Sequence, residues 1–236
     1  MVVEPSRDGQ ECVRAVLCSG GLDSAVLVAH EARSNIVQPV YVSAGLAWER
    51  AEQAAIARLL QAPLFAGVRP LVLLVCPVTD VYASSHWAIR GAPPPYDTPD
   101  SDVYLVGRNV LLLPKVALYC ALHEIRHIAV GPLAGNPFPD ATPAFFAAMG
   151  RALSLGMDHS IEIAAPFATL DKREVIRIGA DFEVPWELTL SCMSPVDGGH
   201  CGRCSKCRER LQAFDAAGLS DPAPYAFRPS DVATGR

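Results

Sequence analysis

Short, mostly apolar runs alternate with helical patterns along most of this chain. Runs of strand length occur at 15–18, 40–42, 71–75, 127–130 and 161–164. Strands that are apolar on both faces are typical of a parallel sheet covered by helices on both sides. The alternation therefore predicts an α/β fold with a doubly wound, Rossmann-like parallel sheet and right-handed crossovers. In such sheets, ligands bind beyond the carboxyl ends of the strands.

Helical patterns fill the intervals between these runs. The expected helices are 24–32, 48–60, 110–122, 144–155 and 171–179. We expect the last of them to end at Gly179. Two Pro- and Gly-rich segments, 77–107 and 131–143, leave from strand carboxyl ends, as does the loop that begins at Ser19. Because 77–107 is long for a structureless connection, we expect it to be functional or to carry short elements.

The segment Ser19-Gly20-Gly21-Leu22-Asp23-Ser24 lies between the first expected strand and the first expected helix. Its glycines let the backbone approach an anion, and the helix N-terminus offers unpaired N–H groups and the positive end of a dipole. Asp23 is unusual beside phosphates unless it holds a magnesium ion or a loop N–H. The alternative interpretation is an ordinary turn before a capped helix. A Walker A loop is excluded, because no lysine follows the second glycine.

Four of the eight cysteines gather near the C-terminal end with the spacing C-x8-C-x2-C-x2-C. They are Cys192, Cys201, Cys204 and Cys207. Four thiolates complete a tetrahedral shell, so the pattern predicts a structural zinc site with no open position for a catalytic water. His200 is a rival ligand. A C-x2-C redox pair and an iron–sulfur cluster are the alternative interpretations of this array.

The charge of the chain bears on its partners. The formal net charge is −5 and the pI is about 5.7, which disfavours nucleic acid as the main partner. Arg203, Lys206, Arg208 and Arg210 offer one local basic patch. Residues 1–11 contain no apolar run, and no apolar stretch is long enough to span a bilayer, so we expect a cytoplasmic protein without a membrane partner.

The glycine loop matches the SGGxDS loop of the PP-loop ATP pyrophosphatases. With Gly107-Arg108-Asn109 and the cysteine array, it makes the chain resemble the 7-cyano-7-deazaguanine synthase (QueC/ExsB) family of these enzymes, over nearly the whole chain to Phe214. That family converts 7-carboxy-7-deazaguanine to the nitrile with ATP and ammonia. The resemblance implies a PP-loop fold with ATP, Mg²⁺ and structural Zn²⁺, and it suggests a homodimer.

The resemblance also implies roles for individual residues. The expected ATP-binding residues are Cys18, Ser19, Gly20, Gly21, Leu22, Asp23, Ser24, Arg108 and Asn109. Asp23, Arg108 and Lys172 are the expected catalytic residues, and the Lys172 amine would neutralise phosphate charge while a substrate carboxylate is adenylated. The ordinary alternatives are a solvated lysine at 172 and a loop salt bridge at Arg108.

Two loops depart from the family pattern on the acceptor side. Where the family carries Tyr-Gly-Gln after its second strand, residues 43–49 read Ser-Ala-Gly-Leu-Ala-Trp-Glu. In the second loop, Thr142 and Ala144 stand where the family has arginine and glutamate. The nucleotide half therefore looks intact and the acceptor half altered, as in a divergent paralogue. Our candidates for the acceptor pocket are Trp48, Trp87, Asn136, Phe138 and Asp140.

From these features we expect an ATP-dependent carbon–nitrogen ligase that adenylates a 7-deazapurine-like carboxylate and aminates it with ammonia or an amine. One alternative is a paralogue that uses another carboxylate or stops at an amide. Another is a non-catalytic nucleotide- or RNA-binding zinc protein. The 236 residues suit an ATP-binding domain at 12–182, a four-cysteine zinc-binding segment packed on it at 183–218, and a Pro- and Ala-rich tail at 219–236.

Overall fold

The structure, a computed structural model, describes residues 12–228. Five parallel strands form one sheet in the order β3-β2-β1-β4-β5, which confirms the doubly wound parallel fold. The strands are β1 (Val13–Leu17), β2 (Ile36–Ser43), β3 (Val72–Val75), β4 (His127–Ala129) and β5 (Glu162–Ala164). The chain runs outward from β1 to β3 and then crosses back to β4, so the topological switch point lies between β1 and β4.

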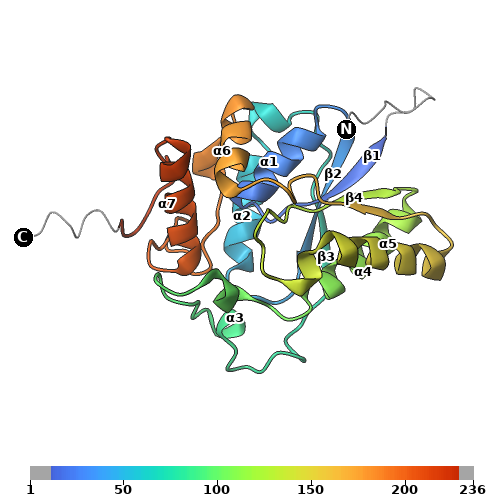
Figure 1. Ribbon diagram of the computed structural model, residues 1–236, viewed down its shortest axis with the longest axis horizontal. Coiled ribbons are helices and arrows are strands. Elements are labelled where there is room, and N and C mark those ends of the chain that lie inside the picture. The colour runs from blue at the N-terminus through green and yellow to red at the C-terminus, as the bar shows by residue number, and fades with distance from the viewer. Residues whose placement is uncertain (1–11, 229–236) are drawn as a thin grey trace, which may run out of the picture.

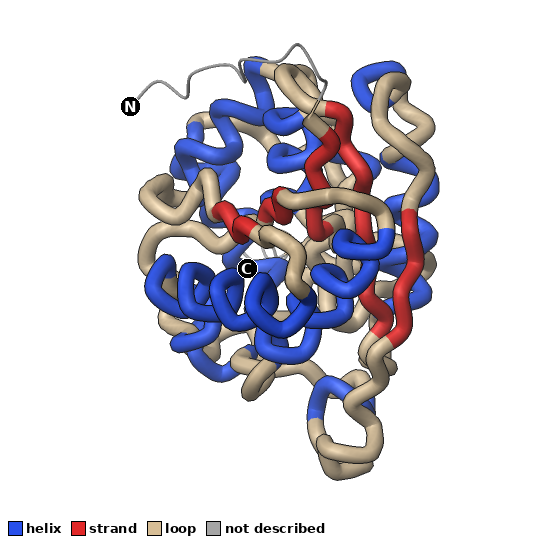
Figure 2. Tube along the Cα trace, turned by 90° about the vertical axis from the view of Figure 1, so that its right-hand side faces the viewer, coloured by secondary structure: helices blue, strands red, loops and turns tan. Residues whose placement is uncertain are grey.

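Helices cover both faces of the sheet (Figures 1 and 2). One layer contains α1 (Leu22–Glu31), α2 (Glu49–Leu59), α6 (Lys172–Asp181) and α7 (Ser205–Ala217). The other contains α4 (Arg108–Leu122) and α5 (Pro143–Met157). Each layer encloses its own apolar core. Neighbouring residues of β1 show this, because Val16 packs in the first core and Ala15 in the second.

The loops at the carboxyl edge of the sheet carry short elements of their own. The long loop after β3 contains α3 (Trp87–Arg90) and a short 3₁₀ helix at Asp100–Val103. The loop after β4 carries another 3₁₀ helix at Pro139–Ala141. Further 3₁₀ turns occur at Pro63–Phe65 and Trp186–Leu188. No helix within residues 12–228 has the length and apolar character needed to cross a bilayer.

The strand bounds differ from the expected ones by up to two residues in most strands, and two strands differ more clearly. β2 extends from Ile36 and not from 40, because Gln38 and Pro39 interrupt the apolar run without interrupting the strand. β3 was expected to be covered on both faces, but it is an edge strand, and Leu73 and Val75 are 52% and 58% exposed. An apolar run does not reveal that its strand lies at the edge of the sheet.

Gly179 does not end α6, contrary to the expectation, since the helix continues to Asp181. A Cβ atom at this glycine would lie 2.2 Å from Cη2 of Trp186 and 2.7 Å from Cγ2 of Val26. The absence of a side chain therefore lets Trp186 pack directly against the helix backbone. Gly179 is a close-contact position and not a helix stop.

We predict that Gly179→Ala lowers the free energy of unfolding by about 1–3 kcal/mol, because the added methyl overpacks the contact with Trp186. Gly156→Ala is the matched control. It lies in α5 with nothing within 4 Å of the added Cβ, and it should gain about 0.5–1 kcal/mol from helix propensity alone. Urea denaturation of both variants measures the difference. Equal effects would contradict the assignment of Gly179 as a contact residue.

Candidate functional site

A cavity of about 330 Å³ opens at the carboxyl edge of the sheet, a size typical of small-ligand sites. It brings together most of the residues expected to bind nucleotide or acceptor. Those that line it are Cys18, Ser19, Gly21, Leu22, Asp23, Ser24, Trp48, Arg108, Asn109, Asn136, Phe138, Asp140 and Lys172. Gly20 and Trp87 do not line it. The cavity also includes Tyr41 and Glu52, which are not among the expected site residues, and Lys206, which is expected only in the basic patch.

The glycine loop joins β1 to α1 with a backbone that only glycine adopts easily. Gly20 has φ +72°, and a Cβ there would lie 2.8 Å from Cγ1 of Ile56. Gly21 then precedes α1 in an extended conformation, with no side-chain cap for the helix. Ser24 Oγ donates to the Gly21 carbonyl at 3.0 Å. The first-turn N–H groups of α1 thus remain available to an anion at the floor of the cavity.

A chain of ion pairs joins the glycine loop to two other helices. Lys172 Nζ, at the start of α6, donates to Asp23 Oδ2 at 2.9 Å and also to Glu209 Oε1 on α7. Glu209 Oε2 accepts in turn from Lys206 Nζ. We call Asp23, Lys172, Glu209 and Lys206 the ion-pair chain. Burial alone would lower the pKa of Lys172, but the charges of Asp23 and Glu209 raise it above its usual value, so this lysine stays protonated.

Asp23 therefore holds a lysine and not a loop N–H. Its other oxygen, Oδ1, is buried and accepts no hydrogen bond from residues 12–228. An unpartnered carboxylate oxygen is a suitable ligand for a hard divalent cation. Asp23 is thus the residue of the glycine loop best placed to hold Mg²⁺.

The N-terminus of α4 forms another wall of the cavity. Asp140 Oδ2 accepts from the backbone N–H of Asn109 at 2.8 Å, and the Asn109 side chain donates to the Asp140 carbonyl at 2.8 Å. This pair of bonds fixes the loop after β4 to the first turn of α4, where a carboxylate is favourable. Arg108, the adjacent residue, makes no ion pair within residues 12–228 and lines the cavity. Its cation is therefore available to a ligand.

Glu52 places a carboxylate in the cavity wall that the sequence analysis did not identify. It lies on α2, is buried, and accepts a hydrogen bond from Tyr41 Oη at 2.7 Å. Burial raises its pKa to about 7, against the opposing effects of Arg108 and Tyr41. A signal was present, because Glu52 shares one helical stripe with buried Ile56 and Leu59. A glutamate on a buried helical stripe indicates a candidate functional residue.

The altered loop after β2 is closed by Glu49. Its carboxylate accepts from Ser43 Oγ at 2.6 Å and from the N–H groups of Ala44 and Gly45 at 2.6 and 3.2 Å. These bonds satisfy polar groups at the turn into α2 that would otherwise be buried without partners. Glu49 therefore fixes the loop that carries Trp48.

Aromatic pairs form the acceptor side of the cavity. Trp48 and Trp87 stack with centroids 5.7 Å apart and planes 7° apart. Trp48 lines the cavity, and Trp87 supports it from behind. Phe138 stacks on Tyr104 at 4.9 Å, and Asn136 Oδ1 accepts from the Phe138 N–H at 2.9 Å. The long loop after β3 thus supplies the partners of two cavity-lining rings.

The four cysteines of the array meet at one point. Their Sγ atoms all lie within 4.8 Å of one another, with Cys192 and Cys204 3.9 Å apart and Cys201 and Cys207 3.9 Å apart. A tetrahedral zinc thiolate site, with Zn–S bonds of about 2.3 Å, needs sulfur–sulfur distances of about 3.8 Å. Backbone N–H groups point at three of the sulfurs. The cluster therefore fits a four-coordinate metal ion.

His200 does not join this cluster. Its Nε2 accepts from the Ser191 N–H at 3.1 Å, and its ring stacks on Tyr225. Burial, helped by the charge of Arg210, lowers its pKa to about 4, so the ring is neutral. His200 ties the cysteine segment to the cavity loop at Ser191.

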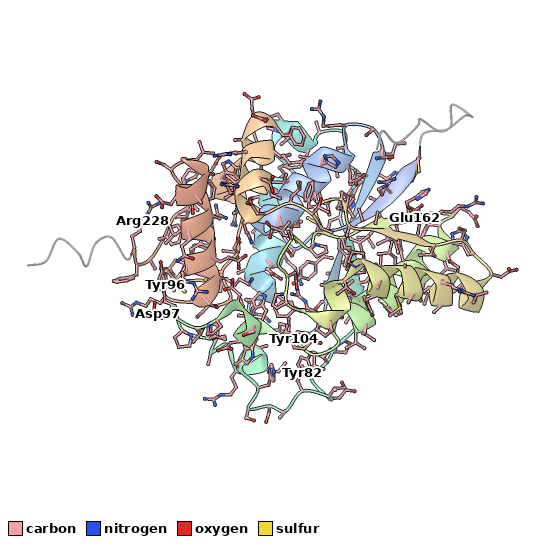
Figure 3. All side chains as sticks on the ribbon, viewed as in Figure 1. Tyr82, Tyr96, Asp97, Tyr104, Glu162 and Arg228 are labelled. Atoms are coloured by element: carbon pink, nitrogen blue, oxygen red, sulfur yellow. The ribbon has the colours of Figure 1, made fainter. Side chains whose placement is uncertain are left out.

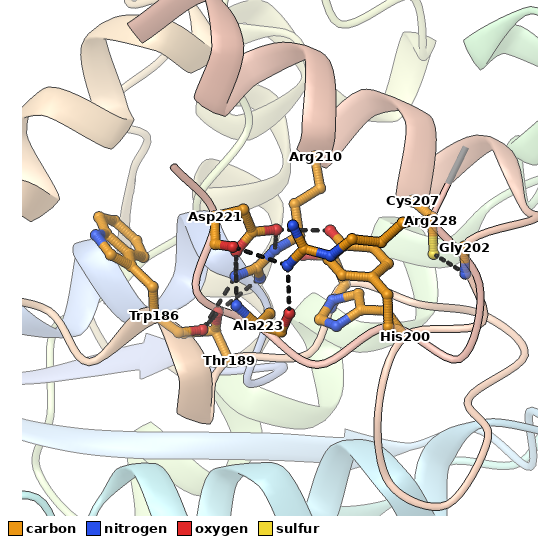
Figure 4. A network of polar contacts seen from close by, with 11 residues as sticks. Trp186, Thr189, His200, Gly202, Cys207, Arg210, Asp221, Ala223 and Arg228 are labelled. Atoms are coloured by element: carbon orange, nitrogen blue, oxygen red, sulfur yellow. Dashed lines mark hydrogen bonds and ion pairs between the residues drawn. The ribbon is translucent and has the colours of Figure 1, made fainter. Parts of the chain in front are cut away.

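Two of the four residues of the expected basic patch, Arg208 and Arg210, are engaged by structural partners. Arg210 is 1% exposed and forms a bidentate pair with Asp221, with both N···O distances 2.8 Å (Figure 4). It also donates to Thr189 Oγ1 and to the Trp186 carbonyl. Burial alone would raise the pKa of Asp221, but the bonds from Arg210 lower it, so the pair is ionised. A helical wheel places Arg210 on one stripe with buried Cys207 and Phe214, but it does not reveal the partner that stabilises the buried charge, because Asp221 lies in the expected tail.

Arg208 also has a structural partner. It donates to the carbonyls of Tyr96 and Thr98 at 2.8 and 2.6 Å and pairs with Asp100 at 2.6 Å. Figure 3 shows Tyr96 beside the N-terminal end of α7. The long loop after β3 is therefore fastened to the cysteine segment.

The first part of the expected tail packs on the cysteine segment. The His200 N–H donates to the Pro224 carbonyl at 2.9 Å, and Tyr225 Oη donates to Asp221 Oδ2 at 2.6 Å. Arg228 donates to the carbonyls of Asp221 and Ala223. Residues 229–236 of the tail lie outside the described part of the chain.

Comparisons with known proteins agree on one family. A family model described as "Queuosine biosynthesis protein QueC" matches residues 14–218. A 7-cyano-7-deazaguanine synthase from Methanothrix thermoacetophila is 34% identical over 90% of this chain and 98% of its own length. One from Acidobacterium capsulatum is 30% identical over 91% of this chain and 97% of its own length.

Shorter or weaker matches also occur. A 7-cyano-7-deazaguanine synthase from Thermosynechococcus vestitus is 42% identical, but the match spans 53% of this chain and 57% of that protein. A solved structure described as a predicted subunit of tRNA methyltransferase from Methanocaldococcus jannaschii has a TM-score of 0.46 at 13% identity, over 72% of this chain and 74% of its own. That TM-score is too low to support an argument.

The raised pKa of Glu52 predicts a pH-dependent stability. The folded protein holds this proton up to about pH 7, whereas an unfolded glutamate releases it near 4.5. The contribution of Glu52 is therefore fully present below pH 4.5 and is lost as the pH rises through 7. Glu52→Gln should remove this loss, which is on the order of 3 kcal/mol at about 1.4 kcal/mol per pKa unit.

Urea denaturation at several pH values between about 4.5 and 8 measures this effect. The free energy of unfolding of Glu52→Gln, relative to wild type, should rise with pH across this window. Glu187→Gln, at an exposed glutamate, is the control and should follow the wild-type slope. If the free energy of unfolding of Glu52→Gln changes with pH as steeply as that of the wild type, the prediction is contradicted.

Proposed function

The chain belongs to the QueC family of queuosine biosynthesis proteins, and on that premise we propose that it is an ATP-dependent 7-cyano-7-deazaguanine synthase. The observation that carries the proposal is a shared cavity in which the glycine loop, Lys172 and Arg108 meet an aromatic wall. An anion site beside a pocket for a flat ring suits an enzyme that joins ATP to a heteroaromatic carboxylate.

In the proposed reaction, the triphosphate of ATP lies on the N-terminus of α1 and the carboxylate of 7-carboxy-7-deazaguanine attacks the α-phosphate. A bond forms between the carboxylate oxygen and the α-phosphorus, and the bond to the β-phosphate oxygen breaks. Lys172 and Arg108 stabilise the charge that develops on the phosphate oxygens. Asp23 keeps Lys172 in place, and its Oδ1 is the candidate ligand for Mg²⁺, which would neutralise phosphate charge.

Ammonia then displaces AMP from the acyl-adenylate, which gives the amide. A second ATP would adenylate the amide oxygen and release pyrophosphate. Departure of that oxygen with AMP, together with loss of the two amide protons, would then give the nitrile. Such chemistry needs positioning and charge neutralisation more than acid–base groups. These steps describe a carbon–nitrogen ligase, the reaction class that we propose.

On the acceptor side, we propose that Trp48 and Phe138 hold the 7-deazapurine ring by stacking. The carboxylate of Asp140 is engaged by Asn109, so we assign it to shaping the cavity and not to contacting the acceptor. The polar groups that line the cavity and could contact the heterocycle include Tyr41, Glu52 and the Asn136 amide. Thr142, which stands in place of the family arginine, caps α5 by accepting from the Phe145 N–H, so it contributes no cation to the cavity.

We propose that Cys192, Cys201, Cys204 and Cys207 hold one structural Zn²⁺, which makes 183–218 a metal-dependent segment on the ATP-binding domain at 12–182. The four thiolates supply a closed shell, so the ion would cross-link the segment and leave no position for a substrate. No step of the proposed reaction passes through it.

Incubation of the protein with 7-carboxy-7-deazaguanine, ATP, Mg²⁺ and ammonia tests the proposed function. We expect the nitrile by mass spectrometry, with AMP and pyrophosphate as coproducts. Amide without nitrile would show that the reaction stops one step earlier. If protein that carries its metal forms neither the nitrile nor the amide, the proposal is overturned.

Asp23→Asn is the informative variant in this assay. It keeps the size of the side chain but removes the charge that faces Lys172, so we expect AMP formation to fall by about 10²-fold or more, as for the loss of one preorganised electrostatic group. The Asp97→Asn change, in an exposed loop, should leave the rate unchanged.

Metal analysis of the purified protein should find one zinc per chain. Because the ion organises the cluster, prolonged chelation should also lower the unfolding temperature. Iron in place of zinc would contradict the zinc assignment, and a metal-free protein of unchanged stability would remove the structural role.

A further inference from the structure

The ion-pair chain contains a second lysine that the proposed function does not use. Lys206 lies in the first turn of α7, between the candidate metal ligands Cys204 and Cys207. Its side chain is 29% exposed, and it lines the same cavity as Lys172 and the glycine loop. The cysteine segment thus also presents a cation to the nucleotide site.

Glu209 holds both lysines at once. Its Oε1 accepts from Lys172 and its Oε2 accepts from Lys206, so one carboxylate sets the positions of two ammonium groups. Two cations held near each other repel, and the two carboxylates of the ion-pair chain offset that repulsion. The two positive and two negative charges balance, which keeps the arrangement stable before any ligand enters.

The ammonium groups keep hydrogen-bond donors for a ligand. An ammonium has three donors. Lys172 uses two of them, for Asp23 and Glu209, and Lys206 uses one, for Glu209. The remaining donors lie at a cavity whose floor is the N-terminus of α1. A polyanion on that floor is the ligand whose charge matches them.

We infer that Lys206 binds the triphosphate of ATP together with Lys172, and that Glu209 is the positioning residue for both. This inference rests on the proposed function in one respect, namely that ATP is the ligand of the glycine loop. It makes α7 of the cysteine segment one side of the phosphate site.

Binding of α,β-methylene-ATP, measured by calorimetry on the metal-loaded protein with Mg²⁺, tests the role of Lys206. Lys206→Met should weaken binding at least about tenfold, the equivalent of ~1.4 kcal/mol. Lys206→Arg should restore part of the loss. Arg203→Met is the matched control, because Arg203 is an exposed cation of the same segment that lies over the Phe227 ring and does not line the cavity.

Glu209 needs a readout that a merely structural role would not move. With pyrophosphate release as the assay, Glu209→Gln should raise the KM for ATP and leave the KM for the carboxylate within about twofold. The increases in the KM for ATP that Glu209→Gln and Lys206→Met cause singly should also be less than additive in the double variant, since both substitutions remove the same contact. Zinc content and unfolding temperature identify any variant that fails to fold.

Affinity of Lys206→Met for α,β-methylene-ATP equal to that of wild type would overturn the inference. So would a Glu209→Gln variant whose only change is lower stability. If either substitution prevents folding, Lys206→Gln and Glu209→Asp take its place in the same measurements. If the wild-type protein binds the analogue through Lys206 but forms no product from 7-carboxy-7-deazaguanine, the proposed function fails and the phosphate role of Lys206 stands.

Discussion

The site depends on one geometric constraint, that parallel strands all end at the same edge of a sheet. Because β1 to β5 run in one direction, the loops that follow them are brought together although they are far apart in the chain. The order reversal between β1 and β4 leaves a crevice between Cys18 and Gly131, and the cavity lies there. The topology therefore fixes where the cavity lies, and contacts such as the ion-pair chain and the aromatic wall fix its shape and charge.

Features set by local spacing were predictable from the sequence. The five strands, the glycine loop and the cysteine array each depend on residues that lie close together in the chain, and the structure confirms the fold and brings the four cysteines together. Contacts between distant residues were not predictable. Lys172 reaches Asp23 across 149 residues, and Arg208 reaches Tyr96 across 112. No periodicity or spacing carries information about such pairs.

Burial of charge was the other failure of sequence reasoning. Arg210 and Glu52 are both buried, yet the sequence predicts Arg210 in a surface patch and gives Glu52 no role. Each is tolerated because a specific partner compensates it, Asp221 for the arginine and Tyr41 for the glutamate. Partners of this kind become visible only when the chain is folded.

The helix α7 begins with a candidate metal ligand at each end of its first turn. The next two residues contact other parts of the molecule, since Arg208 donates to the long loop and Glu209 accepts from the cavity-lining Lys172. One helix is therefore shared by the cysteine cluster, the loop and the proposed phosphate site. Thermodynamic reciprocity then applies: by whatever factor the metal strengthens nucleotide binding, the nucleotide strengthens retention of the metal. A metal ion that strengthens nucleotide binding would thus be lost last, under metal scarcity, from the chains that hold nucleotide.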